Sequence, residues 1–181
     1  MKFASYQVIV GNYIFLKEVI EKLENNYFPL MTKSEIIEDK RSIIKELKHD
    51  TAFKLLSKLE ADIRTDYNQT INSKFKDALS RKYIQLCQKL RENHKKKGKK
   101  KKKIVCRKTR LDDILDTVKL YFQELGNPLS RDCSVIKGYF NGFRNWYAHG
   151  RYYQKPLAPD PEDIERIYLD FENEIFNRKR R

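Results

Sequence analysis

Apolar residues recur every three or four positions along nearly the whole chain, and this spacing constrains the fold more than any other feature. A repeat of that length places apolar side chains on one face of an α-helix. No segment shows the alternation of apolar and polar residues that is typical of a half-buried strand, and no unit of about 20 to 50 residues repeats. The sequence therefore predicts an all-α helical bundle of about six to seven helices.

Capping signals and breakers divide this pattern into seven predicted helices. Thr32 and Glu35 have the spacing of a capping box, and Asp50 can cap another helix. Asp160 followed by Pro161 can start the last one. Residues that should end helices are Pro29, Gly126, Pro128 and Gly150. The seven apolar stripes lie within residues 10–23, 36–47, 53–71, 79–90, 111–125, 135–147 and 164–175.

Positive charge is concentrated in two short stretches. The 181 residues include 39 Lys and Arg against 25 Asp and Glu, a net charge of +14. Eleven basic residues lie within 95–110 and four more at 178–181, so the remainder is close to neutral. Such runs attract polyanions by releasing counterions, although they can also be no more than solvated loops. We expect one domain over residues 1–181, with a basic low-complexity loop at 94–108 and a basic tail at 178–181.

The cysteines and the N-terminus indicate the compartment. Cys87, Cys106 and Cys133 are odd in number and widely spaced, which argues against a disulfide framework and for a reducing environment. No secretory signal pattern and no apolar run long enough to cross a bilayer are found. We therefore expect a soluble, cytoplasmic protein.

The sequence carries no pattern for a bound cofactor or metal. His49, His94 and His149 are far apart, and none lies near paired cysteines, so no zinc site is indicated. The chain has no glycine-rich loop with the spacing of a nucleotide site, and its carboxylates are scattered along the helices. We expect neither a metal nor an organic cofactor.

The segment FRNWYAHGRYY, residues 143–153, combines an arginine, a histidine and a second arginine with five further aromatic residues. Histidine, with an ordinary pKa of about 6.5, can accept and donate protons near neutrality. Arginine presents a planar, permanently charged fork that matches phosphate oxygens. Such a pair can cleave RNA without a metal, because the base removes the 2′-hydroxyl proton and the cation stabilises charge on the phosphate.

The positions of these residues on a helix leave two interpretations open. Arg144 and His149 would lie roughly 140° apart on an ideal helix, whereas Asn145 shares the face of His149 and can orient the imidazole or bind a ligand. Trp146 and Tyr147, with the tyrosines that follow, could stack on unpaired bases. The alternative is a packed helix end, because aromatic residues at helical spacing more often belong to a core.

The same segment resembles the signature of HEPN-domain ribonucleases, an arginine, a polar residue and a histidine in the pattern R-x4-6-H. Here these residues are Arg144, Asn145 and His149. The continuation AHGRYY and the earlier LEADIRTDY, residues 59–67, resemble a branch found among prokaryotic defence and toxin-like proteins. The resemblance covers most of the chain, from the third predicted helix to the last.

This resemblance implies a helical bundle that often dimerises, so that two copies of the motif share one cleft. It also implies a metal-independent endoribonuclease that cuts single-stranded or loop RNA, such as tRNA or mRNA, in toxin action or antiviral defence. Arg144 and His149 would be the central catalytic pair, and Asn145 would assist them. Glu60 and Arg64 would support the site from an earlier helix, although their spacing also suits a simple salt bridge.

One departure from the family concerns regulation. HEPN toxins paired with nucleotidyltransferase antitoxins carry a tyrosine two residues after the histidine, where this chain has Arg151. Regulation by that partner is therefore doubtful, while another antitoxin or regulatory partner stays open.

Basic and aromatic residues outside the central pair are expected to contact RNA. They are Lys95, Lys96, Lys97, Lys99, Lys100, Lys101, Lys102, Lys103, Arg151, Tyr152 and Tyr153. Two other functions fit the same residues: a non-catalytic nucleic-acid-binding module, and an inactive HEPN scaffold that binds a partner protein or a nucleotide.

Overall fold

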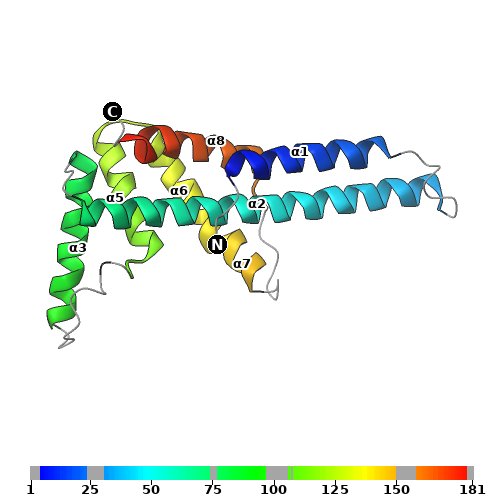
Figure 1. The fold of residues 1–181 in the computed structure, drawn as a ribbon. Helices are drawn as coiled ribbons and strands as arrows, with labels where there is room; N and C mark the ends of the chain where they lie inside the picture. The colour runs from blue at the N-terminus through cyan, green and yellow to red at the C-terminus, as the bar shows by residue number, and fades with distance from the viewer. Residues whose placement is uncertain are drawn as a thin grey trace. The chain divides into compact units, whose positions relative to one another are not determined.

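Helices make up most of the chain in a computed structural model, which describes residues 5–23, 31–73, 77–96, 106, 108–149 and 158–178. In chain order they are α1 (Tyr6–Lys22), α2 (Lys33–Asn72), α3 (Ala78–Lys96), α5 (Leu111–Glu124), α6 (Leu129–Tyr139), η2 (Phe140–Arg144), α7 (Asn145–Ala148), α8 (Pro161–Phe171) and η3 (Glu172–Phe176). The label η marks a turn of π-helix. These ranges contain no strand, and the predicted all-α class is confirmed (Figure 1).

The chain divides into two compact units, each assembled from segments that are distant in the sequence. The first unit takes its described residues from 1–58 and 142–166, and the second from 59–141 and 167–181. The boundaries fall within α2, η2 and α8, so three helical stretches run from one unit into the other. The expectation of one domain over residues 1–181 stays a prediction.

Helix α2 is one helix of 40 residues, where the sequence predicted two. The capping box at its start is confirmed: the Thr32 N–H donates to the Glu35 carboxylate at 2.7 Å, and the Glu35 N–H donates to the Thr32 hydroxyl at 3.3 Å. The predicted cap at Asp50 is wrong, because Asp50 lies within the helix and pairs with Lys54, one turn later, at 2.5 Å. No glycine or proline separates the two predicted helices, so nothing interrupts the hydrogen-bond ladder.

Local signals fix the ends of three other helices. Asp77 accepts a hydrogen bond from the Ser80 N–H at 2.6 Å at the start of α3, and Asp160 accepts one from the Glu162 N–H at 3.2 Å at the start of α8. Gly126 ends α5 as predicted, with a φ of 65° that favours glycine. Helix α3 continues to Lys96, so the predicted loop at 94–108 is wrong at its first three residues. Residues 97–105 and 107 lie outside the described residues.

The first unit is built on α1 and the N-terminal part of α2, which run side by side (Figure 1). The Lys40 ammonium, on α2, donates a hydrogen bond to the carbonyl of Leu23 at the end of α1. Two residues of the predicted apolar stripes, Leu16 and Ile43, are exposed, and their predicted burial is wrong. The buried apolar residues of this unit are Val10, Tyr13, Ile36, Ala52, Leu55, Leu56, Phe143, Trp146 and Ile164.

A half-buried arginine closes the C-terminal end of the second unit. The Arg178 guanidinium donates to Asp66 at 2.8 Å and to Asp77 at 2.9 Å, and it also contacts the hydroxyl of Thr70 at 2.9 Å. Burial acts to lower the pKa of Arg178, but the neighbouring carboxylates raise it above its ordinary value. The prediction of a basic tail at 178–181 is therefore wrong for Arg178, which packs in the fold; residues 179–181 lie outside the described ones.

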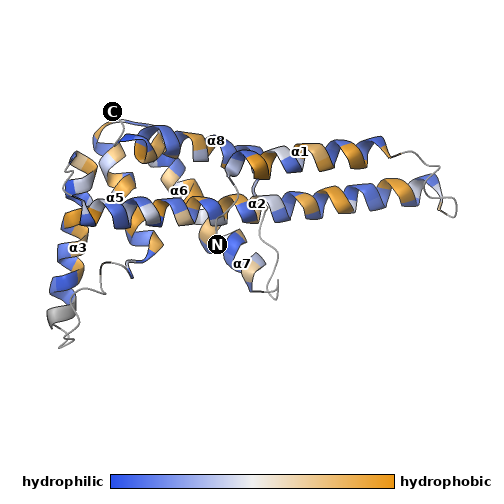
Figure 2. Cartoon of the chain, viewed as in Figure 1, coloured by the Kyte–Doolittle hydropathy of each residue, from blue (hydrophilic) through white to orange (hydrophobic). Residues whose placement is uncertain are grey.

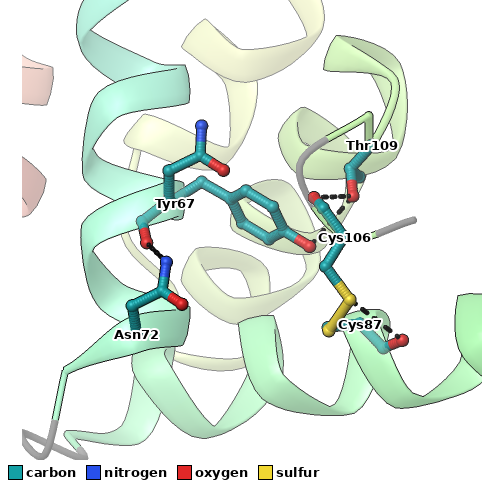
Figure 3. The surroundings of a disulfide bond; sticks show 6 residues. Tyr67, Asn72, Cys87, Cys106 and Thr109 are labelled. Carbon is teal, nitrogen blue, oxygen red and sulfur yellow. Dashed lines mark hydrogen bonds between the residues drawn. A yellow bond between two sulfur atoms is a disulfide. The ribbon is translucent and has the colours of Figure 1, made fainter. Parts of the chain in front are cut away.

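A disulfide joins Cys87 of α3 to Cys106, with their Cα atoms 5.2 Å apart (Figure 3). The spacing of the cysteines argued against a disulfide framework, and for this pair that expectation is wrong, because residues 19 apart in the sequence meet where the chain returns to α3. Thr109 extends this attachment: its hydroxyl donates to the Cys106 carbonyl at 2.7 Å and lies 3.0 Å from the Tyr67 hydroxyl. Residues 106 and 109 are thus held against both α2 and α3.

Candidate functional site

The motif residues follow a change of helical pitch at the end of α6. The chain passes from α6 into the π-helical turn η2, returns to α-helix for the four residues of α7, and leaves the helix at His149. A π turn contains more residues than an α turn, so it rotates everything that follows around the helix axis. The predicted uninterrupted sixth helix is wrong here, and the 140° separation expected for Arg144 and His149 does not apply.

Asn145 bonds to Arg144 through its side chain and to His149 through the backbone alone. Its side-chain oxygen accepts a hydrogen bond from the Arg144 guanidinium at 3.3 Å, and its carbonyl accepts one from the backbone N–H of His149 at 3.1 Å. Arg144 and Asn145 are half-buried, whereas His149 is exposed. The sequence predicted that the Asn145 side chain orients the imidazole or binds a ligand; the structure shows it bonded to the arginine instead.

A cluster of aromatic side chains packs α7 against α2. Trp146 is buried against His49 of α2, with the ring centroids 6.3 Å apart and the rings nearly perpendicular. Phe143 lies 5.9 Å from the same imidazole, and Tyr147 stacks on Phe53 at 4.9 Å. Buried aromatic contacts of this kind fix a helix firmly. Trp146 is therefore a core residue, and the interpretation that it stacks on bases is wrong.

His49 is the residue of this region that sequence reasoning missed. It is buried, and its Nδ1 lies 3.7 Å from a carboxylate oxygen of Glu46. One signal was present: His49 stands one helical turn before Phe53, in line with the apolar stripe. The sequence predicted a helix boundary at Asp50, which assigned His49 and Phe53 to different helices.

An ion pair holds the start of α8 to α2 in the same unit. The Lys48 ammonium donates to the Asp160 carboxylate at 2.5 Å, and this bond raises the pKa of Lys48. Burial acts to raise the pKa of Asp160, but hydrogen bonds from Lys48 and the Glu162 N–H lower it overall. Asp160 thus caps α8 and attaches it to α2.

A groove of about 530 Å³ lies along the α1–α2 pair and reaches α7. The residues that line it are Leu16, Ile20, Ser42, Ile43, Glu46, Leu47, Asp50 and Tyr147. This lining is largely apolar, and its charged members are acidic. The groove is therefore unsuited to a phosphate group, and Tyr147 is the member of the predicted motif segment that borders it.

The predicted supporting pair, Glu60 and Arg64, belongs to the second unit. The Arg64 Nε donates to Glu60 at 2.9 Å, which confirms a salt bridge between residues one helical turn apart. The same guanidinium donates to the carbonyl of Thr109 at 3.0 Å. Arg64 therefore holds the chain just beyond the disulfide, and support of the catalytic site by this pair stays a prediction.

Most of the residues predicted to contact RNA cannot be placed. Lys97, Lys99 to Lys103, Arg151, Tyr152 and Tyr153 lie outside the described residues. Lys95 and Lys96 form the last turn of α3, and their side chains are likewise outside the description. Their contacts with RNA stay predictions.

Two features are absent from the part of the chain that the structure describes. No group of three or more His, Cys, Asp and Glu side chains there is arranged to hold a metal ion. No helix in the same ranges combines the length and the apolar character needed to span a membrane.

Comparison with known proteins gives no match: no family model, no curated protein and no solved structure is similar to the chain. The resemblance to HEPN proteins therefore depends on the motif residues themselves.

Proposed function

We propose that the chain is a metal-independent endoribonuclease of the HEPN type, with Arg144 and His149 as its catalytic pair. One observation supports the proposal: the Arg144 guanidinium donates a hydrogen bond to the side chain of Asn145, which lies four residues before the exposed His149 at the end of the same short helix. His149 is exposed, as a residue that acts on a polymer must be.

The reaction follows from the chemistry of these two side chains. The His149 imidazole takes the proton of a ribose 2′-hydroxyl, and the freed oxygen attacks the adjacent phosphorus. The bond from phosphorus to the 5′-oxygen breaks, that oxygen takes a proton from water, and the imidazolium returns its own proton to the solvent. The Arg144 guanidinium stabilises the negative charge that builds on the phosphate oxygens. The products are a 2′,3′-cyclic phosphate and a 5′-hydroxyl end.

The wider context of the proposal comes from the resemblance. The substrate is single-stranded or loop RNA of the tRNA or mRNA class, and the role is toxin action or antiviral defence. Two copies of the chain share one catalytic cleft. The lysine-rich sequence at 95–103 attracts the RNA backbone, and its contribution weakens as salt is raised.

The direct test incubates the full chain with end-labelled RNA in EDTA and compares wild type with His149→Ala. Cleavage should fall by about 100-fold or more, while RNA binding stays close to wild type, because the basic stretches are unchanged. His94→Ala removes a histidine outside the motif and serves as the matched control. Equal cleavage by wild type and His149→Ala would defeat the catalytic assignment.

A non-catalytic nucleic-acid-binding module is the second candidate, and the lysine-rich sequence favours it. It predicts salt-sensitive RNA binding that is unchanged by Arg144→Ala and His149→Ala, without any RNA product. Measuring binding and cleavage on the same samples separates the two functions.

A further inference from the structure

The groove of the first unit has an apolar side. Leu16 and Ile20 of α1 line it together with Ile43 and Leu47 of α2. The members of each pair stand four residues apart, so each pair forms a row along its helix. Leu16 is 44% and Ile43 49% exposed, and Figure 2 shows apolar residues along both helices where they run side by side. The apolar side is therefore open to a molecule from solution.

A row of polar residues forms the other side of the groove. Ser42, Glu46 and Asp50 follow one another at intervals of four residues, next to the apolar row of α2. At 1.5 Å per residue, this row is about 12 Å long. Tyr147 lies toward the Asp50 end, because its ring stacks on Phe53, which follows Asp50 by three residues. Apolar, polar and aromatic groups thus line one groove within the length of a small molecule.

The charge of the groove is negative, although the chain as a whole carries +14. Its charged lining residues are Glu46 and Asp50, both acidic. Asp50 pairs with Lys54 at 2.5 Å, so its charge is largely offset. The Glu46 carboxylate is half exposed and lies 3.7 Å from the His49 Nδ1, and an imidazole offsets a negative charge only when it is protonated. With a neutral His49, the charge of Glu46 favours a cation in the groove.

We propose that the groove binds an organic amine, a small molecule with one ammonium group on an apolar body. The apolar body packs on the four apolar residues, and the ammonium group donates a charge-assisted hydrogen bond to Glu46. The Tyr147 ring adds an aromatic surface, which also attracts cations. The groove volume of about 530 Å³ lies within the range of small-molecule sites, about 300–1,000 Å³.

This site is separate from the proposed catalytic pair. The residues that line the groove include neither Arg144 nor His149. Tyr147 belongs to α7, which also carries Asn145, so a bound amine lies against the helix that holds the motif. Binding of the amine does not depend on the proposed ribonuclease activity.

Calorimetric titration of the full chain with three probes that share one apolar body tests the proposal. The probes are 4-phenylbutylamine, 4-phenylbutanol and 4-phenylbutyrate, which are a cation, a neutral alcohol and an anion at neutral pH. The amine should bind about tenfold more tightly than the alcohol, because it gains a hydrogen bond to a charged group, and the butyrate should bind most weakly. Non-specific attraction to a chain of +14 would favour the butyrate instead. Equal affinities, tightest binding of the butyrate, or no binding of the amine at millimolar concentration would overturn the proposal.

Substitution of one carboxylate separates the contribution of charge from that of the apolar lining. Glu46→Gln should weaken binding of the amine about tenfold and leave binding of the alcohol unchanged. Glu38→Gln makes the same change at an exposed position of α2 outside the groove lining, and it should leave both affinities at the wild-type value. Circular dichroism should show unchanged helix content in both variants, because both side chains face solvent. Equal binding of the amine by wild type and Glu46→Gln would contradict the proposal.

Methyl NMR spectra locate the bound probe. Addition of 4-phenylbutylamine should shift the methyl signals of Ile43 and Leu47 and leave those of Ile114, buried in the second unit, unchanged. Shifts of Ile43 that appear without the probe as protein concentration rises would show that a second copy covers the groove, and would overturn the proposal. These measurements need no RNA, so a chain that binds the amine but cleaves no RNA would refute the proposed function alone.

Discussion

Three arginines of this chain make different contacts. Arg178 is enclosed by Asp66 and Asp77, and Arg64 is bonded to Glu60 and to the chain near the disulfide. Arg144 contacts the neutral side chain of Asn145 at the end of a helix. The sequence singled out Arg144 through the motif, but it did not show that Arg178, the first residue of a basic run, is bonded to two carboxylates.

A substitution that keeps the charge of Arg144 tests the importance of its shape. Arg144→Lys retains a cation but loses the planar fork that matches phosphate oxygens and bonds to Asn145. We expect kcat/KM for RNA cleavage to fall by about 100-fold, comparable with the loss of one transition-state donor elsewhere. Arg131→Lys, at an exposed position of α6, should leave the value near wild type. A fall of less than about twofold in Arg144→Lys would show that charge alone is sufficient.

At the scale of helices, signals confined to a few residues predicted the structure best. The capping box at Thr32 and the stop at Gly126 could be read directly because each acts over three or four residues. Asp50 carries the same signal as a true cap, and only the uninterrupted helix around it shows otherwise. The π turn before Arg144 and the pairing of Cys87 with Cys106 depend on tertiary packing, and no local pattern reveals them.

The disulfide should make a measurable contribution to stability. Joining residues 19 apart restricts the unfolded chain, and for a loop of this size the expected stabilisation is about 3 kcal/mol. Urea unfolding of oxidised protein, compared with protein reduced by a phosphine, should show that difference in the free energy of unfolding. Cys87→Ser should match the reduced protein, and Cys133→Ser, which leaves the bond intact, should still respond to reduction. Identical unfolding curves for oxidised and reduced wild type would mean that the bond adds no stability.

The ion pair between Lys48 and Asp160 should give a pH-dependent contribution. The pKa of Asp160 is lowered in the folded protein, so its stabilisation is complete above the unfolded value of about 3.9 and disappears as pH falls through the folded pKa. The pKa of Lys48 is raised, so its part is complete below about 10.4 and disappears as pH rises through the folded pKa. Both groups are partly exposed, which limits the contribution to about 1 kcal/mol.

The free energies of unfolding of wild type and Asp160→Asn, compared across pH, measure this contribution. The variant should be less stable than wild type between about pH 5 and 9, and the difference should shrink toward zero near pH 2. Lys54→Met removes the ammonium group of the exposed ion pair between Lys54 and Asp50 on α2. It controls for general effects of charge. A difference that is constant from pH 2 to 7 would indicate that Asp160 acts without its charge.

For the whole molecule, the fold class followed from periodicity, but the function depends on which groups the chain brings together. The apolar spacing predicted an all-α chain because burial of one helical face dominates folding. It did not predict the exposed apolar residues of α1, since the same spacing describes a face that packs within the chain and one that stays exposed. The motif residues were recognisable, while the bonds between Arg144, Asn145 and His149 required coordinates.

The measurement that tests the central claim most directly compares an RNA oligonucleotide with its 2′-O-methyl counterpart, both in EDTA. Attack by the 2′-hydroxyl requires that group to be free. The account predicts cleavage of the unmodified RNA to a 2′,3′-cyclic phosphate and a 5′-hydroxyl end, with the methylated strand bound but uncut. Cleavage of both strands, or products carrying a 5′-phosphate, would contradict the roles assigned to His149 and Arg144.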